Sequence, residues 1–295
     1  MTDPTAISGP SLAARRSGFL AGAVIGAALA ARTADLTDAD AIRAAGDAPL
    51  PAPPGRRRAA IALGDGLLEE LLAGGVDLRR LASRWIAWQA DDGLDADPAL
   101  VEALAHLREF NAPALQLSAY GPAPLAAALP AALTASSPRN MLNGTFHVAR
   151  LLDPSETTAL AAVAVVVAAS RFLEGARDFI PDVLAVLRSN EAPPVLFELF
   201  AAIPRDPRAV PAMPRGATPA PELVAQWALW HAHHRPRSAE VLAAMQAAGG
   251  VSSTAGSILG GLLGARDGLD AWPSAWRATS GEDVALRLAL GDRLG

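Results

Sequence analysis

The stretch Gly18-Phe-Leu-Ala-Gly-Ala-Val-Ile-Gly-Ala-Ala-Leu29 places a glycine at every fourth position of an apolar run. The same spacing returns near the other end of the chain, at Gly256, Gly260 and Gly264. Residues four apart lie on one face of a helix, and each glycine costs a helix about 1 kcal/mol relative to alanine. Such regular glycines indicate a compensating close approach of a neighbouring backbone. We therefore expect two central helices, each packed tightly against a neighbour, with each other as one candidate.

The rest of the chain repeats apolar residues at intervals of three and four and shows little of the alternation typical of strands. The clearest stripes are Leu78, Leu81, Trp85 and Trp88, and Leu223, Trp227 and Trp230. A stripe of this kind is typical of the buried face of a helix. The pattern predicts an all-α protein with these tryptophans in its core.

Proline-rich segments divide the helical pattern, because proline does not continue a helix interior. They are Pro51–Pro54, Pro122–Pro138, Pro193–Pro194 and Pro204–Pro221. The last of these is the longest, and it is either a domain linker or an ordered loop over a site. Composition does not differ enough across it to require two domains. We expect a disordered tail at residues 1–12 and one domain at residues 13–295.

Composition excludes several chemistries. The 295 residues include no cysteine and no lysine, so all 25 basic residues are arginine. This excludes a thiolate nucleophile, a disulfide framework, an iron–sulfur cluster, a Schiff base and a phosphate-loop lysine. A net charge of −5 gives no basic field for nucleic acid.

Two apolar runs, Phe19–Ala31 and Ala159–Ala169, are shorter than the roughly 20 residues of a membrane span. The first has arginines before it but no convincing cleavage site after it, so a signal peptide is not favoured. We interpret both runs as core helices and expect a cytoplasmic protein that contacts neither membrane nor nucleic acid.

Four blocks follow one another along nearly the whole chain. The first is the glycine-striped Gly18–Leu29, and the second runs from Ile61 through Leu72 and Gly74-Gly75-Val76-Asp77 to Trp88. The third is Asn143-Gly144. The fourth is Gly249-Gly250-Val251-Ser252-Ser253-Thr254, followed by Ile258–Ala265, Gly268, Pro273 and Trp276.

In content, order and spacing these blocks resemble the ADP-ribosylglycohydrolases, which include the dinitrogenase reductase-activating glycohydrolases and the J-crystallins. The family motifs are a glycine-rich opening helix, a TDDT block, an asparagine–glycine turn and a closing GGDTDT block. The resemblance implies a compact single-domain bundle of many α-helices. It also implies hydrolysis of an ADP-ribosyl bond with two Mg²⁺ ions held by acidic residues of the blocks.

This sequence departs from the family where that chemistry needs carboxylates. In a gap-free alignment the first-block acids become Ala27 and Ala34, TDDT becomes Arg58-Ala59-Ala60-Ile61, and the closing acids become Val251 and Ser253. Only Thr254 keeps a ligand oxygen, and a shift of register would restore Asp35 or Asp65 but not the whole set. Because Mg²⁺ requires several oxygen ligands, we predict no metal and no other cofactor.

The replacements are mostly small or apolar, which predicts a neutral cavity suited to a small organic ligand. The residues expected to bind substrate are Arg58, Ala60, Ile61, Tyr120, Asn140, Val251, Ser252, Ser253 and Thr254. The residues expected to act in catalysis are Asn143, Asp65 and His147. Among them His147 is the expected general acid or base, because histidine titrates near neutral pH.

Each candidate has a structural alternative. His147 is otherwise a structural histidine, the hydroxyl residues at 252–254 are helix N-caps, and Tyr120 is a packing anchor or a lid residue. Arg56, Arg57 and Arg58 precede an expected helix and form either an anion site or a solvated basic loop. His231, His233 and His234 have metal-like composition, but their spacing favours a polar cluster at a helix end.

Three functions remain open at this point. The first is a repurposed, metal-independent enzyme that cyclises, eliminates or isomerises a small organic substrate. The second is a non-catalytic protein that binds an ADP-ribose-like ligand or a protein partner. The third is a residual glycoside hydrolase, which needs a pair of carboxylates. The sequence leaves the oligomeric state open.

Overall fold

The computed structural model describes residues 9–53, 56–91, 93–134 and 137–293. These residues form helices joined by loops and contain no β-strand, which confirms the all-α prediction. The elements are α1 Leu12–Thr33, α2 Ala39–Ala45, α3 Ala59–Leu72, α4 Leu78–Asp91, α5 Pro98–Phe110, α6 Ala123–Ala128, the 3-10 helix η1 Leu129–Leu133, α7 Pro138–Leu152, α8 Glu156–Leu173, α9 Ile180–Ser189, α10 Pro194–Ala201, α11 Pro221–His234, α12 Ser238–Ala248, α13 Ser253–Asp267, the 3-10 helix η2 Leu269–Ala271, α14 Ser274–Thr279 and α15 Gly281–Asp292.

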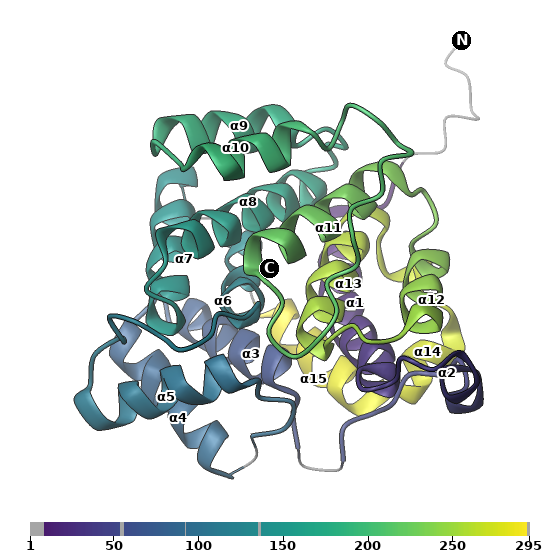
Figure 1. Cartoon of the computed structure of the whole chain (residues 1–295), viewed down its shortest axis with the longest axis horizontal. Coiled ribbons are helices and arrows are strands. Elements are labelled where there is room, and N and C mark those ends of the chain that lie inside the picture. The colour runs from purple at the N-terminus through teal and green to yellow at the C-terminus, as the bar shows by residue number, and fades with distance from the viewer. Residues whose placement is uncertain (1–8, 54–55, 92, 135–136, 294–295) are drawn as a thin grey trace.

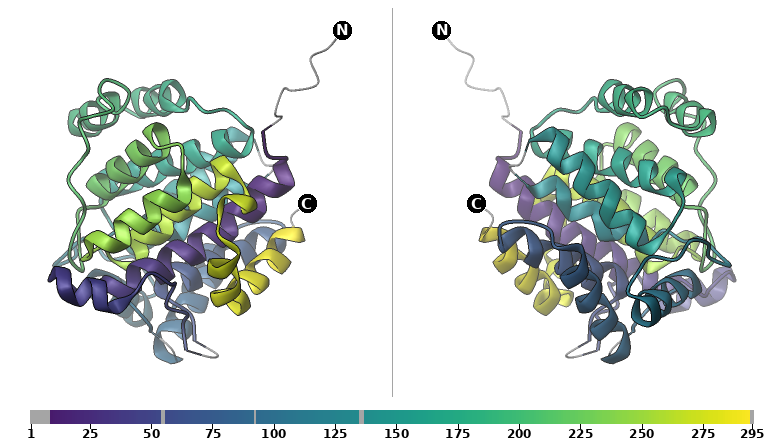
Figure 2. Two further views of the ribbon diagram at one scale, coloured as in Figure 1. Left: turned by 90° about the vertical axis from the view of Figure 1, so that its right-hand side faces the viewer. Right: turned by 90° about the vertical axis from the view of Figure 1, so that its left-hand side faces the viewer.

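The two glycine-striped segments are α1 and α13, and they pack against each other (Figure 2). A Cβ atom added to Gly22 would lie 2.2 Å from the carbonyl oxygen of Gly260, and one added to Gly260 would lie 2.0 Å from the carbonyl oxygen of Gly22. Gly18 pairs in the same way with Gly264, and Gly26 with Gly256, so the helices run antiparallel. The predicted close approach is confirmed, with each helix as the neighbour of the other.

The remaining helices surround this pair and share one hydrophobic core with it (Figure 1). Trp85, Trp227 and Trp230 are buried as predicted, whereas Leu223 is 46 % exposed and lies outside the core. Trp272 is also buried, and its indole nitrogen donates a hydrogen bond to the carbonyl oxygen of Gly18 at 3.1 Å. In Figure 1, α9 and α10 lie along the top edge and α4 and α5 at the lower left.

Helix α1 begins earlier than expected. The predicted tail at residues 1–12 lies mostly in residues 1–8, which are outside the described residues. Ser11 is the N-cap of α1, its hydroxyl accepts a hydrogen bond from the backbone of Ala14, and Leu12 is already helical. The cap places the start of the helix about two turns before the apolar run Phe19–Ala31 that marked it in the sequence.

Two proline-rich segments differ from simple loops. The segment Pro122–Pro138 contains α6 and η1, because proline at the first positions of a helix removes only N–H groups that have no partner there. The segment Pro204–Pro221 is an ordered loop: Gly216 donates a backbone hydrogen bond to Gly250 at 3.0 Å, and Met213 packs against the core.

Two helices, α1 and α8, are long and apolar enough to span a membrane by length and composition. Most of each helix is buried inside the protein, as in core helices. Both helices extend beyond the apolar runs Phe19–Ala31 and Ala159–Ala169. The runs alone were therefore shorter than a membrane span, although the helices are not.

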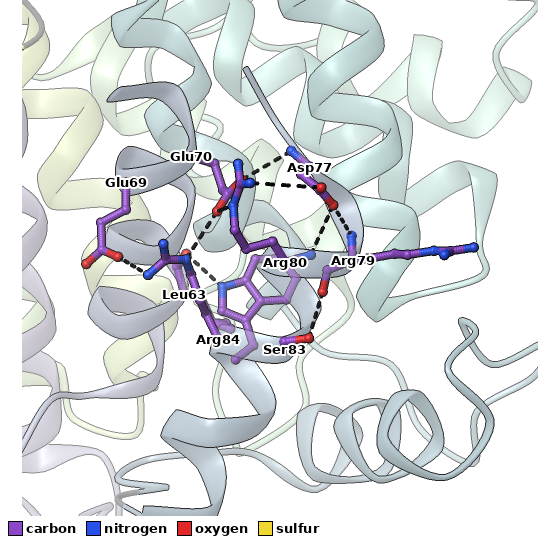
Figure 3. A network of polar contacts seen from close by, with 9 residues as sticks. Leu63, Glu69, Glu70, Asp77, Arg79, Arg80, Ser83 and Arg84 are labelled. Carbon is purple, nitrogen blue, oxygen red and sulfur yellow. Dashed lines mark hydrogen bonds and ion pairs between the residues drawn. The ribbon is translucent and has the colours of Figure 1, made fainter. Parts of the chain in front are cut away.

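Helix α3 is held to α4 by a buried carboxylate (Figure 3). The Glu70 side chain is fully buried and accepts hydrogen bonds from Arg80, with Nε to Oε1 at 2.7 Å and Nη2 to Oε2 at 2.6 Å. Arg84 Nε adds a hydrogen bond at 3.1 Å, and the Asp77 backbone adds one at 3.2 Å. The hydrogen bond from Arg80 holds the pKa of Glu70 below its ordinary value. This network fixes the helix whose first turn carries residues 59–61.

Candidate functional site

A pocket of about 300 Å³ lies where α1 ends and α13 begins, and we call it the α1–α13 pocket. Ala31, Ala34 and Asp35 line it from the end of α1, and Ser252, Ser253 and Thr254 line it from the start of α13. The segment before α5, residues 95–98, and Gly216 with Ala217 of the ordered loop complete the wall. The first and fourth sequence blocks therefore meet at one cavity.

Backbone hydrogen bonds hold these walls together. Gly250 donates to the carbonyl oxygen of Thr33 at 2.9 Å, which joins the end of α1 to the segment before α13. The Thr33 hydroxyl donates to the carbonyl oxygen of Gln246 at 3.1 Å. On the other side, Arg215 and Val251 form an isolated antiparallel bridge. These hydrogen bonds fix the walls of the pocket relative to one another, as precise binding geometry requires.

The hydroxyl groups of the pocket divide into one structural group and two available groups. Ser252 is the N-cap of α13, and its hydroxyl accepts a hydrogen bond from the backbone of Ala255 at 3.2 Å. Ser253 and Thr254 are 4 % and 3 % exposed and line the pocket. Within the described part of the chain neither hydroxyl has a hydrogen-bond partner, so both are available to a ligand.

Three aspartates line the same pocket in different electrostatic states. Asp35 is exposed. Asp95 forms an ion pair with the buried guanidinium of Arg58. Asp97 is buried and is the N-cap of α5, where Oδ1 accepts a hydrogen bond from the backbone of Leu100 at 2.8 Å. Burial raises the pKa of Asp97 above its ordinary value, because removal from water disfavours the charged form.

These residues do not fit a pair of Mg²⁺ ions. The family's acidic positions hold Ala34 and Ser253 at the pocket, and Ala27 is buried within α1. Of the three aspartates that are present, Asp95 is neutralised by Arg58 and Asp97 already accepts hydrogen bonds from a helix N-terminus. Among the described residues, no group of three or more His, Asp or Glu side chains forms a candidate metal site.

Four predicted site residues do not line the pocket. Ala60 and Ile61 are buried in the first turn of α3, and Val251 is buried in the segment before α13. Arg58, the N-cap of α3, reaches the pocket wall through Asp95, and its Nη2 also donates to the carbonyl oxygen of Leu50 at 2.8 Å. Of these four residues, Arg58 is tied to a lining residue by its ion pair and Val251 by its position next to Ser252 in the chain.

Asp65 is held in an interior ion pair. Its side chain is 1 % exposed, and Oδ1 accepts a hydrogen bond from Nε of the buried Arg287 at 2.6 Å. Arg57 donates to Oδ2 at 3.3 Å. Asp65 does not line the α1–α13 pocket, so its carboxylate serves to neutralise a buried arginine.

The other predicted catalytic residues lie on α7, away from this pocket. Asn143 and Gly144 are in the middle of that helix, so the expected asparagine–glycine turn is wrong here. The Ser137 cap, the proline at the first position and the buried face of α7 outweigh the local preference for a turn. His147 is exposed and touches the ring of Phe146. The structure does not bring Asp65, Asn143 and His147 together.

The remaining predicted residues are spread over other surfaces. Asn140 lines a separate apolar cavity between α3, η1 and α7. Tyr120 is 42 % exposed, next to Gly121, whose added Cβ would lie 3.1 Å from the Asp97 carboxylate oxygens. Arg57 and Arg58 are paired with carboxylates, so the expected anion site at the start of α3 is already filled by the protein's own acids.

The three histidines lie in the last turn of α11. His231 contacts the rings of Trp227 and Trp230, and burial lowers its pKa to about 4. His234 Nε2 lies 2.6 Å from the carbonyl oxygen of Ile203.

Sequence reasoning missed Asp95 and Asp97. The dipeptide Asp97-Pro98 is a recognisable helix start, with a capping side chain followed by proline, and that signal predicts α5. It does not predict that the loop before α5 packs beside the N-terminus of α13, because the two are more than 150 residues apart.

Comparison with known proteins gives one consistent result. The family model for ADP-ribosylglycohydrolase matches residues 8–294. A solved structure titled "ADP-ribosylglycohydrolase-related protein complex" superposes with a TM-score of 0.74 at 22 % sequence identity, covering 97 % of this chain and 99 % of that one. No curated protein sequence matches. The structural likeness shows a shared fold, and the family match spans almost the whole sequence. The chain therefore belongs to the ADP-ribosylglycohydrolase family.

Proposed function

We propose that this family member is a metal-independent enzyme that transforms a small organic substrate in the α1–α13 pocket by acid–base chemistry. The observation that carries the proposal is the buried Asp97, which lines the pocket and whose pKa is raised by burial. A carboxyl group with a raised pKa stays protonated to a higher pH than an exposed one and is suited to deliver a proton to a substrate. Asp97 takes the role that His147 was expected to play.

The other pocket groups have complementary roles in this proposal. The free hydroxyls of Ser253 and Thr254 would orient the substrate by hydrogen bonds. The ion pair between Arg58 and Asp95 leaves that part of the wall without net charge, which suits a neutral substrate. Substrate positioning and one proton-transfer group are sufficient for a cyclisation, an elimination or an isomerisation.

A second candidate is metal-independent cleavage of a glycosidic bond. It is favoured by one observation: Asp35, Asp95 and Asp97 line the same pocket. Glycoside hydrolysis needs one protonated carboxyl group as acid and one charged carboxylate as base or nucleophile. In this reaction Asp97, with its raised pKa, is the acid and the exposed Asp35 is the charged partner.

The test uses Asp97→Asn, because asparagine caps a helix as well as aspartate does but does not transfer a proton. The protein is incubated with panels of small organic acids, amines and glycosides, including ADP-ribosyl conjugates, with EDTA or with Mg²⁺, and products are followed by mass spectrometry. We expect turnover that EDTA leaves unchanged and that Asp97→Asn reduces by about 10²-fold or more. Turnover should fall as pH rises through the raised pKa of Asp97.

Asp38→Asn is the matched control, because Asp38 is also an N-cap aspartate but belongs to α2 and does not line the pocket. It should leave turnover unchanged. Turnover that requires Mg²⁺, or that survives Asp97→Asn, contradicts the proposal. Tight binding of ADP-ribose with no turnover of any panel member would favour the non-catalytic alternative instead.

A further inference from the structure

A second cavity, of about 580 Å³, lies between α11, α12 and the ordered loop at residues 204–220, and we call it the α11–α12 cavity. It is larger than the α1–α13 pocket and shares no lining residue with it. Its walls include Met213 from the loop, Trp227 from α11, and Val241 and Met245 from α12. Neither the family resemblance nor the proposed chemistry uses this cavity.

The lining is mostly apolar, so the part of a ligand that lies inside the cavity, its body, should also be apolar. Trp227, Val241 and Met245 are 1 %, 8 % and 2 % exposed, so they are ordered by the core and form a firm surface. An indole and two methionine side chains favour a ring or a branched hydrocarbon, because aromatic and thioether groups adapt to such shapes. Cavities of several hundred Å³ with apolar walls and a few polar groups are typical of small-molecule sites.

The positive charge at the rim indicates the polar head group of the ligand, which should be an anion. The Arg235 guanidinium lies 4.8 Å from the centre of the Trp230 ring, and it forms no ion pair with any carboxylate of the described residues. Arg237, on the same rim, is paired with Glu240 at 2.7 Å and is therefore already neutralised. One uncompensated positive charge at the mouth of an apolar cavity complements a single anionic group.

His231 adds a polar group that the protein does not use. It lines the cavity, and its Nδ1 is buried without a hydrogen-bond partner among the described residues. A buried polar atom left without a partner costs free energy, and a ligand that hydrogen-bonds to it would recover that cost. Burial and the nearby Arg235 lower the pKa of His231 to about 4, so the ring is neutral at pH 7 and does not attract a second anion.

We propose that the α11–α12 cavity is a second binding site, which takes a small organic acid with an apolar or aromatic body and one carboxylate that pairs with Arg235. The body packs against Trp227, Val241 and Met245, and the carboxylate stays at the rim.

The probe is biphenyl-4-carboxylate, compared with biphenyl-4-carboxamide by titration calorimetry on the full chain. The two have the same body, so a difference in affinity measures the head group. We expect the acid to bind about tenfold more tightly than the amide in the wild type. Arg235→Gln should abolish that preference, and the double variant Arg237→Gln with Glu240→Gln should leave it unchanged, because it removes a paired positive and negative charge together. Ala244→Phe, which fills the cavity from α12, should abolish binding of both compounds.

Circular dichroism and thermal unfolding show whether each variant is folded. Asp97→Asn should not change binding, since it alters the other pocket, so this proposal and the proposed function fail separately. Equal affinity for acid and amide, a preference that survives Arg235→Gln, or no binding of the acid up to its solubility limit would overturn the proposal.

Discussion

The helix pair α1 and α13 is packed differently in its middle and at the end where α1 finishes and α13 begins. In the middle, α1 and α13 are separated by so little space that added Cβ atoms would lie 2.0–2.2 Å from carbonyl oxygens, as at Gly22 and Gly260. At the end, the same two helices line the 300 Å³ α1–α13 pocket, with Ala34 at the end of α1 and Ser253 and Thr254 from α13. In the middle, the facing positions leave no room for any side chain, whereas the end has room for several side chains.

This difference explains how one chain keeps the fold of the family although the acidic residues of the family's pocket are replaced. The packing of the middle depends on main-chain atoms and therefore on glycine, so the glycine stripes remain recognisable. The residues at the end border a pocket instead of a backbone, so alanine or serine fits there without strain in place of a carboxylate. A chain of this family therefore keeps its architecture while the charge of its pocket changes.

The largest effect is expected from Gly260→Val in the middle of the pair. The new Cβ would lie 2.0 Å from the carbonyl oxygen of Gly22, and the atom it meets is backbone that does not rotate away. Overpacking a core typically costs about 1–3 kcal/mol where side chains can shift, but here the contact is with backbone and valine adds two further methyl groups, so the cost should exceed about 5 kcal/mol. We expect no cooperative unfolding transition in urea, measured by circular dichroism.

Gly144→Ala is the matched control, because Gly144 is also helical but an added Cβ there meets nothing within 4 Å. Alanine should stabilise the protein by about 0.5–1 kcal/mol through its higher helix propensity. If both substitutions destabilise equally, the close approach of α1 and α13 does not hold the fold together.

The next largest effect is expected from Asp65→Asn, which tests the structural role given to this carboxylate. The substitution leaves the buried Arg287 guanidinium without a counter-charge. Removal of one partner from a buried ion pair costs about 3–5 kcal/mol, measured as the free energy of unfolding in urea. Asp40→Asn breaks an exposed pair with Arg43 and should change that free energy by about 0.5 kcal/mol or less. Similar effects for the two variants would contradict the structural role.

A smaller effect is expected from Glu70→Gln in the network that holds α3 against α4. The loss of charged hydrogen bonds from Arg80 and Arg84 should cost about 1–3 kcal/mol at pH 7. The folded protein lowers the pKa of Glu70, so the unfolded chain binds more protons and the stability from this group is lost as pH falls below its ordinary value of 4.5.

The difference in unfolding free energy between wild type and Glu70→Gln should therefore shrink between about pH 4.5 and more acidic pH, measured by urea titration at each pH. A difference that stays constant over that range would show that Glu70 is not stabilised as a carboxylate by its arginine partners.

Much of the fold could be predicted from the sequence because its signals are local. Glycine at every fourth position, the tryptophan stripe at Trp227 and Trp230, and the prolines between helices all report on neighbours within a few residues. The errors arose where tertiary packing overrides a local preference. Asn143-Gly144 favours a turn but lies inside α7, and Leu223 continues an apolar stripe but is exposed.

The site was less predictable because its parts come from four separate stretches of the chain. The sequence blocks indicated Ser253 and Thr254, which line the pocket, since both lie in a recognisable motif. Asp95 and Asp97 carry no such motif, and they reach the pocket only because α5 begins beside α13. The pairing of Arg58 with Asp95 also depends on a contact across 37 residues, which no local pattern encodes.

The smallest effect is expected from Ser253→Asp, which returns one acidic residue to the end of the pair. An acidic side chain in the first turn of α13 gains about 0.3–1 kcal/mol from the helix N-terminus, and repulsion from Asp35 and Asp95 offsets part of this. The thermal unfolding midpoint should change little and should not respond to millimolar Mg²⁺, because Arg58 still neutralises Asp95. The double variant Arg58→Thr with Ser253→Asp frees Asp95 and should gain a Mg²⁺-dependent stabilisation of about 1 kcal/mol once the ion exceeds its Kd several-fold. An equal response of the single and double variants to Mg²⁺ would show that Arg58 does not control the charge of this pocket.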